Sequence, residues 1–430
     1  MAEGTSVRIC PTCGKEIPEG KAACPRCEHR LEQFLHSRET VLFGSVLIIV
    51  VLFFITGAVA RGYHVKLHAL AGQWFNAGEN ALSAGNAEAA LSDFRNALVY
   101  EPEDPRIQFR LAQALIANER YEEAHSYLLG LLAHSPSDAE VNLALARIAT
   151  GAGDETDALR YYHGAIYGVW PSHPEENRLN ARVELCRFLI GRNDDSNADG
   201  ELMTLEAEIP QQHAAALHEQ AGELFFRAGD TSRALEEFRR ALSAPRPPTE
   251  ALRGAGLASY QLGDFRVAER YLDRAYREKR DDADVAAALD TTHLILAWDP
   301  ESRGLTEAQR RERVRHDLAQ AISLTESCAK SSGIDLSKTP EQTTTAGQNA
   351  GANQKAPAAP SGDVATEYAQ AKNLQAALSD RNLSRHPEEL DAAINMIFEL
   401  ELTASQKCGE PTGLDEALVT LGKHRQNREQ

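Results

Sequence analysis

Four of the seven cysteines in this 430-residue chain lie close together near its start, at a spacing suited to metal binding. Cys10 and Cys13 form one C-x2-C pair, Cys24 and Cys27 form a second, and ten residues separate the two pairs. Two such pairs can direct four thiolates toward one ion in the closed tetrahedral coordination of structural zinc. The spacing therefore predicts a structural Zn2+ held by these four residues, with no open position for a catalytic water.

The segment that carries these cysteines, residues 1–32, is too short to bury a useful hydrophobic core, so a metal would have to hold it together. Disulfides among the four are the alternative, and they require an oxidising compartment. With its two cysteine pairs, the segment resembles the short zinc ribbon found at the N-terminus of many bacterial membrane proteins. The resemblance implies a small docking or regulatory module. The zero net charge of residues 1–39 disfavours nucleic acid as its ligand.

Residues 40–60 contain no charged side chain and are apolar on every helical face. These 21 residues would form a helix about 31 Å long, which matches the ~30 Å hydrocarbon core of a bilayer. A buried core helix is one alternative. A cleaved signal peptide is the other, because Ala58-Val59-Ala60 resembles a cleavage site, but the run is long for a signal and begins only at Thr40. We therefore predict one transmembrane helix that contacts the lipid bilayer through residues 40–60.

The basic residues beside this helix predict its orientation. Within an equal distance on each side, four bases precede the helix and two follow it: Lys21, Arg26, Arg30 and Arg38, then Arg61 and Lys66. Because bases are retained on the cytoplasmic side, we expect a cytoplasmic N-terminus and a periplasmic or extracellular C-terminal part. A reducing cytosol also suits zinc thiolates. The predicted location is a single-pass protein of the bacterial inner membrane.

Beyond the apolar run the chain is rich in alanine and repeats with a period of about 34 residues. The first unit contains Trp74, Gly78, Gly85, Ala90, Phe94, Ala97 and Pro102. These spacings resemble the tetratricopeptide repeat, a helix-turn-helix unit of this length. Five further units align with the first, and the six span residues 71–104, 105–138, 139–172, 179–212, 215–248 and 249–282. The resemblance implies an all-α helical solenoid over residues 71–300, with a helix near 284–297 as its cap.

Small residues recur at two positions of the units, where closely packed helices have no room for larger side chains. On the first helix they are Gly78, Ala112, Ala146, Cys186, Gly222 and Gly256, and on the second Ala90, Ala124, Ala158, Ala198, Ala234 and Ala268. Cys186 belongs to the first set, so we interpret it as a packing residue and not as a nucleophile.

Tetratricopeptide arrays present the first helix of each unit on a concave face that binds peptides, so a protein partner is expected in this groove. Helical projection places an apolar line on that face with arginines beside it. The candidate partner-binding residues are Phe75, Phe109, Leu143 and Val183, with Arg147, Arg187 and Arg227. They suit a partner segment with some acidic character. Local packing of these residues is the alternative. The Lys and Asn pattern of chaperone-binding relatives is absent, which disfavours a chaperone C-terminus.

The remaining chain is predicted as a helix over 301–331, a flexible linker over 332–362 and a helical segment over 363–430. Cys328 and Cys408 each end a helix, so an exported C-terminal part would permit a disulfide between them. Two unrelated buried thiols are the alternative. Four arginines stand close together in the first of these helices, Arg310, Arg311, Arg313 and Arg315. Acids interleave with them, which favours a solvated face over a nucleic-acid patch.

The formal net charge of −18 lies entirely beyond residue 60, because residues 1–60 hold six bases and six acids. An acidic solenoid disfavours nucleic acid as a partner. No nucleophile elbow, metalloprotease motif or phosphate-binding loop is present, so neither an enzyme nor a small-molecule substrate is expected. The sequence predicts a membrane-anchored, non-enzymatic adaptor with an exported repeat domain. The alternatives are a transmembrane coupler or sensor whose ribbon docks a cytoplasmic partner, and an enzyme subunit or nucleic-acid-linked factor.

Overall fold

In the computed structural model, residues 8–210, 214–337 and 364–429 are described, and the side chains of residues 29–37, 39, 40 and 429 are not. The chain forms two compact units, Met1–Gly164 and Ala165–Gln430. The predicted all-α class is confirmed, since among the described residues only β1 and β2, of two residues each, are strands. The predicted linker, residues 332–362, lies for the most part outside the described residues.

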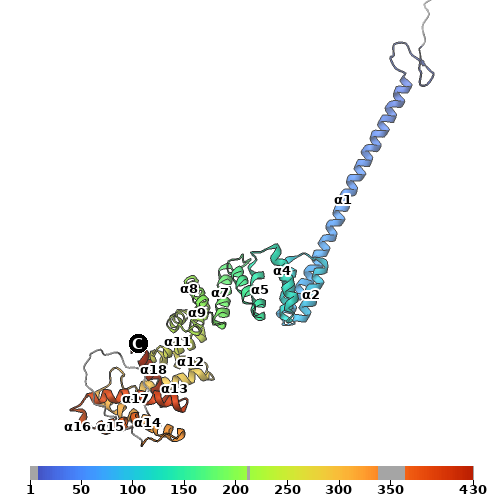
Figure 1. Cartoon of the computed structure of the whole chain (residues 1–430). Helices are drawn as coiled ribbons and strands as arrows, with labels where there is room; N and C mark the ends of the chain where they lie inside the picture. Colours follow the sequence, from blue (N-terminus) through green and yellow to red (C-terminus); the bar gives the residue numbers. More distant parts are fainter. Residues whose placement is uncertain (1–7, 211–213, 338–363, 430) are drawn as a thin grey trace, which may run out of the picture. The chain divides into compact units, whose positions relative to one another are not determined.

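The first unit begins with a two-stranded sheet followed by a very long helix. Strand β1 (Arg8–Ile9) pairs antiparallel with β2 (Glu16–Ile17). Helix α1 (Pro25–Ser83) is unbroken over 59 residues (Figure 1). Its stretch from Val41 onward is the one helix among the described residues that is long and apolar enough to cross a membrane, and the large apolar side chains of residues 41–59 are exposed.

The end of α1 opens a series of antiparallel helices in the same unit. They are α2 (Ala87–Tyr100), α3 (Pro105–Ala117), α4 (Tyr121–His134), α5 (Ala139–Ala152) and α6 (Glu155–Ile166). Aspartates precede three of them and accept hydrogen bonds from backbone N–H groups of the first turn: Asp104 from Arg106 at 2.8 Å, Asp138 from Val141 at 3.1 Å and Asp154 from Asp157 at 3.0 Å. Such caps satisfy N–H groups that the helix itself leaves free.

The second unit continues the pattern and then departs from it. Its repeat helices are α7 (Pro174–Gly191), α8 (Asp195–Glu208), α9 (Ala215–Arg227), α10 (Thr231–Leu242), α11 (Thr249–Gln261), α12 (Phe265–Glu278) and α13 (Ala283–Trp298). Five more helices follow: α14 (Glu307–Ser332), α15 (Val364–Ala377), α16 (Asp380–Leu383), α17 (Glu388–Cys408) and α18 (Leu414–Glu429).

A left-handed residue divides the two helices of every predicted repeat at the same position. The residues with positive φ are Gly85, Glu119, Gly153, Asn193, Gly229 and Gly263, each 14 positions after the start of its unit. Glycine adopts this conformation without steric cost, and it occupies four of the six places. The regular spacing shows that the six units share one phase, including the two in which Glu119 and Asn193 replace glycine.

The two sets of small residues lie where the helices pack most closely. All twelve are buried, and a Cβ atom added to Gly78 would lie 2.7 Å from the ring of Phe94. The same clash of 2.7 Å would occur between Gly222 and Phe238. Cys186 is fully buried in this set, and burial raises the pKa of its thiol to about 12. It therefore packs as a small apolar residue.

The C-terminal helices pack against the end of the repeats and do not form a separate tail. Helix α18 lies against α13, and α14, α15 and α17 pack around one another. One apolar core joins residues of the last repeat, such as Phe265, with Val314, Ile397 and Leu418. The expected capping helix α13 is therefore itself covered. Hydrophobic periodicity placed these helices correctly but did not indicate what they pack against.

The four arginines of α14 are half-buried, and three of them contact other parts of this bundle, which the expected local pairing did not indicate. Arg310 pairs with Asp391 of α17 at 2.8 Å. Arg313 donates to the carbonyl of Asp299 at 2.8 Å, and Arg315 donates to that of Leu378 at 2.8 Å. Only Arg311 forms the expected pair one helical turn away, with Glu307. Interactions between distant elements, not local pairing, account for this cluster.

Glu401 in α17 is fully buried, and its carboxylate oxygens have no hydrogen-bond partner among the described residues. Burial, reinforced by the nearby carboxylates of Asp415 and Asp317, raises its pKa to about 9. Because an unfolded glutamate loses its proton near pH 4.3, the stability of this bundle should fall as the pH rises from about 4.3 to 9. We expect Glu401→Met to increase the free energy of unfolding at pH 7 by on the order of 3 kcal/mol.

Denaturant unfolding at pH 5, 7 and 8.5 measures this effect, and the gain should be smallest at pH 5. Glu399→Met, at an exposed position of the same helix, is the matched control and should change stability by less than about 0.5 kcal/mol. A Glu401→Met protein that is less stable than wild type at pH 7 would contradict the conclusion that burial of the Glu401 carboxyl destabilises the bundle at that pH.

Candidate functional site

The structure brings Cys10, Cys13, Cys24 and Cys27 together, with all four sulfur atoms within 4.8 Å of one another. Cys10 Sγ lies 3.8 Å from Cys27 Sγ, and Cys13 Sγ lies 3.7 Å from Cys24 Sγ. Four ligands at a zinc–sulfur distance of about 2.3 Å in a tetrahedron would stand about 3.8 Å apart. The cluster can therefore hold one metal ion, and its all-thiolate donor set fits zinc.

Backbone hydrogen bonds shape each cysteine pair. The N–H of Cys10 donates to the carbonyl of Lys15 at 2.8 Å, and the N–H of Gly14 donates to the carbonyl of Cys10 at 2.9 Å. Gly14 has a φ of 67°, which only glycine adopts readily. In the second pair, Cys24 caps α1 and its carbonyl accepts from the N–H of Cys27 at 3.0 Å. A turn and a helix start thus present the two pairs to each other.

The thiols influence one another's ionisation. Hydrogen bonds from the backbone N–H groups of Thr12 and Cys13 lower the pKa of Cys10 to about 6. The neighbouring thiol of Cys13, followed by burial and the other two cysteines, raises the pKa of Cys27 to about 12. Four thiolates at this separation repel one another, so full ionisation requires a cation between them.

The predicted groove residues differ in exposure. Leu143 is 8% exposed and Val183 is 2% exposed, so both belong to the core of their repeats. Phe75 is half-buried, with its ring 5.7 Å from that of Phe94, and Phe109 is also half-buried. The expected apolar line is therefore not exposed along its length, because Leu143 and Val183, its last two members, are buried.

The three predicted arginines are exposed on first helices of their repeats. Arg147 lies on α5 in the first unit, and Arg187 on α7 and Arg227 on α9 lie in the second. The guanidinium of Arg227 pairs with Glu223 at 2.8 Å, one helical turn away. These arginines remain the accessible part of the predicted partner-binding set.

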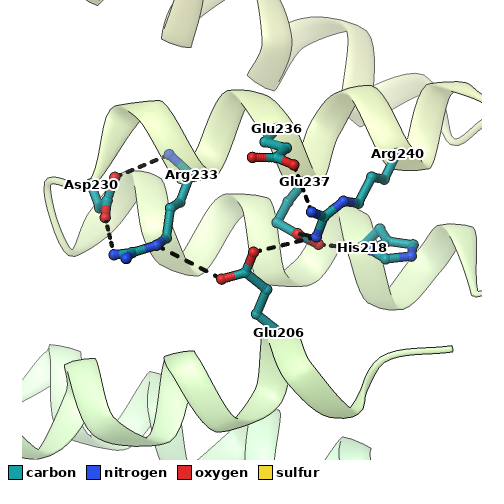
Figure 2. Close-up of polar contacts among 7 residues, drawn as sticks. All are labelled: Glu206, His218, Asp230, Arg233, Glu236, Glu237 and Arg240. Atoms are coloured by element: carbon teal, nitrogen blue, oxygen red, sulfur yellow. Dashed lines mark hydrogen bonds and ion pairs between the residues drawn. The ribbon is translucent and has the colours of Figure 1, made fainter. Parts of the chain in front are cut away.

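A polar network between α8, α9 and α10, buried at His218 and Glu237, escaped the sequence analysis (Figure 2). His218 Nδ1 lies 2.7 Å from Glu237 Oε2, and these residues are 5% and 0% exposed. Arg240 contacts Glu237 and also lies 3.4 Å from Glu206 of α8. Arg233 joins the same Glu206, at 3.8 Å, to Asp230 at 2.7 Å. The network links the fourth repeat to the fifth.

The preceding repeat carries an equivalent pair. Arg182 is 2% exposed and contacts Glu201, and their separation in the sequence equals that between His218 and Glu237. A base on the first helix and a glutamate on the second thus recur in two consecutive repeats. That recurrence at one fixed separation was the signal available in the sequence. Burial makes such pairs costly to break, so they act as structural links between helices.

Cys328 at the end of α14 and Cys408 at the end of α17 stand in disulfide geometry. Their Cα atoms are 5.6 Å apart, within the range that a disulfide spans without backbone movement. Cys328 is 4% exposed, and the Ser332 hydroxyl lies 3.4 Å from Cys408 Sγ. The packing of α14 against α17 brings the two cysteines together from 80 positions apart in the sequence.

Comparison with known families identifies the repeats. Two profiles of the tetratricopeptide repeat match the chain, one over residues 81–148 and one over residues 219–283. The chain therefore contains tetratricopeptide repeats, and its helices form a tetratricopeptide solenoid. Such repeats indicate a scaffold for protein–protein interactions.

Several solved structures are similar to part of this chain. The pilF protein of Pseudomonas aeruginosa is 14% identical over 51% of this chain and 97% of that chain, with a TM-score of 0.41. PilW, a type IV pilus biogenesis factor, is 15% identical over 51% of this chain and 98% of that chain, with a TM-score of 0.42. The TPR2AB domain of yeast Sti1, solved with pHSP90, is 16% identical over 53% and 98%, with a TM-score of 0.22.

No curated protein matches this chain. Because the structural similarities are low, the assignment of the repeats depends on the family profiles and on the regular helix geometry described above.

Proposed function

We propose that this protein is a membrane-anchored adaptor, without enzymatic activity, that binds a protein partner through its tetratricopeptide repeats. The observation that carries the proposal is α1, one unbroken helix that links the four-cysteine cluster, the apolar stretch and the first repeat. An apolar helix with exposed side chains requires a lipid environment, and residues 40–60 have the length of a bilayer core.

The proposed orientation has the cysteine cluster, with a structural zinc ion, in the cytoplasm and the repeats in the periplasm. More basic residues precede the apolar stretch than follow it. Thiolates that bind zinc suit a reducing compartment, whereas a disulfide between Cys328 and Cys408 suits an oxidising one. Opposite redox requirements at the two ends of the chain agree with opposite sides of a bacterial inner membrane.

The proposed contact surface is the exposed face that carries Arg187 and Arg227. Both belong to first helices of their repeats and are exposed. Arginine recognises carboxylates through paired hydrogen bonds, so a partner segment with acidic side chains is favoured. In the first compact unit, Met1–Gly164, the proposed contact residues are Phe75, Phe109 and Arg147.

A photo-crosslinking residue placed at Arg187 or Arg227 in living cells should capture a protein partner, which mass spectrometry then identifies. Arg277 of α12 is the matched control, because it also pairs with an acid one turn away, Asp273, but lies on a second helix. The double variant Arg187→Glu/Arg227→Glu should bind the partner identified in this way at least about tenfold more weakly than wild type, as expected for central arginines of an interface. Equal capture at all three positions would reject the proposed face.

A transmembrane coupler is the second candidate, favoured by the same unbroken helix. Helix α1 is capped by Cys24 and continues into the first repeat. A movement of the first repeat can therefore be transmitted to the cysteine cluster, because no loop interrupts the helix between them. In that case the cluster would dock a cytoplasmic partner, and the capture of that partner would depend on occupation of the repeats.

A further inference from the structure

The segment of α1 just after the apolar stretch carries two histidines on one face. His64 and His68 are four residues apart, the spacing at which helical side chains are neighbours. Paired imidazoles at this spacing on a helix can bind one metal ion together. The carboxylates that face this pair follow α2, a full helix further along the chain.

The connection between α2 and α3 supplies those carboxylates. A surface cavity of about 430 Å³ lies between it and α1, within the first unit. The cavity is lined by His64, His68, Glu101 and Glu103, together with Leu67 and Asp104 among others. No lysine or arginine is among the lining residues, so the cavity favours cations.

One imidazole and one carboxylate already meet there. His68 Nδ1 contacts Glu101 Oε1, and the Glu101 side chain is only 16% exposed, whereas that of His68 is 73% exposed. Asp104 serves another purpose, because its carboxylate caps α3 and pairs with Arg106 at 2.9 Å. His64, His68 and Glu101 are therefore the groups that remain to bind a ligand, with Glu103 beside them.

We propose that His64, His68 and Glu101 form a binding site for a divalent transition-metal ion. Two imidazole nitrogens and one carboxylate oxygen are a ligand set that suits zinc, and copper and nickel also bind imidazole well. The cavity has room for water at the remaining coordination positions. The contact between His68 and Glu101 does not by itself account for the second imidazole, that of His64, on the same face of α1. It also does not account for the acidic lining of the cavity.

Bound metal would fasten the part of α1 beyond the apolar stretch to the first repeat. Its ligands come from α1 and from the residue that follows α2, so coordination would restrain the helix relative to the connection between α2 and α3. The inference concerns residues of the first unit only and does not depend on the proposed partner or on the proposed orientation.

Zinc content of the untagged full chain in detergent micelles, measured after equilibrium dialysis, tests the site. Wild type should hold two zinc ions per chain, one at the four cysteines and one at the histidines. His64→Ala and His68→Ala should each hold one, with the affinity of the second site reduced at least about tenfold. Glu101→Gln should weaken the second site while leaving both histidines in place.

Two matched controls separate this site from other zinc binding. His134→Ala, at an exposed position of α4, should retain two ions. Cys13→Ser should lose the cysteine-bound ion and keep the histidine-bound one. Wild type that holds a single ion, or a His64→Ala protein that still holds two with unchanged affinity, would overturn the proposal. Because His64 and His68 are exposed, neither substitution should disturb the helix.

Discussion

Removing the proposed metal ion from the four-cysteine cluster is expected to abolish the ordered structure of residues 8–28 and to leave the repeats folded. The segment has almost no core of its own, since its buried apolar side chains are those of Cys10 and Cys24. Its sheet consists of two very short strands, far below what is stable alone in water. We therefore expect metal binding to supply the folding free energy of this segment.

Limited trypsin digestion with mass spectrometry measures this loss of order, because Lys15 and Lys21 lie inside the segment. A chelator or Cys13→Ser should accelerate cleavage at both lysines at least about a hundredfold, following the loss of metal affinity when a ligand is removed. Cleavage within α9 and α10 should not change.

Cys186→Ala is the matched control, since it also removes a thiol but lies in the repeat core. It should leave metal content and cleavage at Lys15 and Lys21 unchanged. Cleavage at these lysines that is equally slow with and without metal would show that the segment folds by other means.

Local features of this protein could be predicted from its sequence because short-range chemistry determines them. Turn glycines such as Gly85 and Gly229 indicated the phase of the repeats, and small residues such as Gly222 indicated the close contacts between helices. The four cysteines could be predicted as a cluster because Cys10 and Cys27 lie so close in the sequence. Each of these signals lies within one helical hairpin or one turn.

Features that depend on how hairpins pack against one another could not be predicted. Periodicity showed which side of a helix is apolar, but Val183 is buried because neighbouring hairpins cover it. The contact of His68 with Glu101 joins α1 to the end of α2, and that of Arg315 with Leu378 joins α14 to the end of α15. No local pattern specifies which surface the helices α14–α18 cover, so their packing on α13 appeared only in the structure.

Breaking the link between Cys328 and Cys408 is expected to destabilise the C-terminal bundle strongly. A disulfide that closes a loop over 80 positions removes chain entropy from the unfolded state worth about 4.5 kcal/mol. The bond joins the ends of α14 and α17, whose shared core includes Leu318 and Ile397. The double variant Cys328→Ser/Cys408→Ser should therefore retain the fold while opening far more often.

Hydrogen exchange of peptides from α14 and α17 reports that opening directly. A loss of about 4.5 kcal/mol corresponds to exchange on the order of a thousandfold faster. Peptides from α9 and α10 are the internal control, because their core is separate from that of the bundle. Reduction of the wild-type protein should reproduce the effect, whereas unchanged exchange in α17 would mean that packing alone holds the bundle.

The state of this cysteine pair in cells also bears on the proposed orientation. Disulfides persist in the periplasm and are reduced in the cytosol. Mass spectrometry of unreduced protein from cells should therefore find Cys328 linked to Cys408, while Cys10–Cys27 remain reduced and metal-bound. Free thiols at Cys328 and Cys408, with the bundle otherwise folded, would place the repeats on the cytoplasmic side. The four N-terminal cysteines would then have to function in the oxidising compartment, where disulfides compete with metal for the same sulfur atoms.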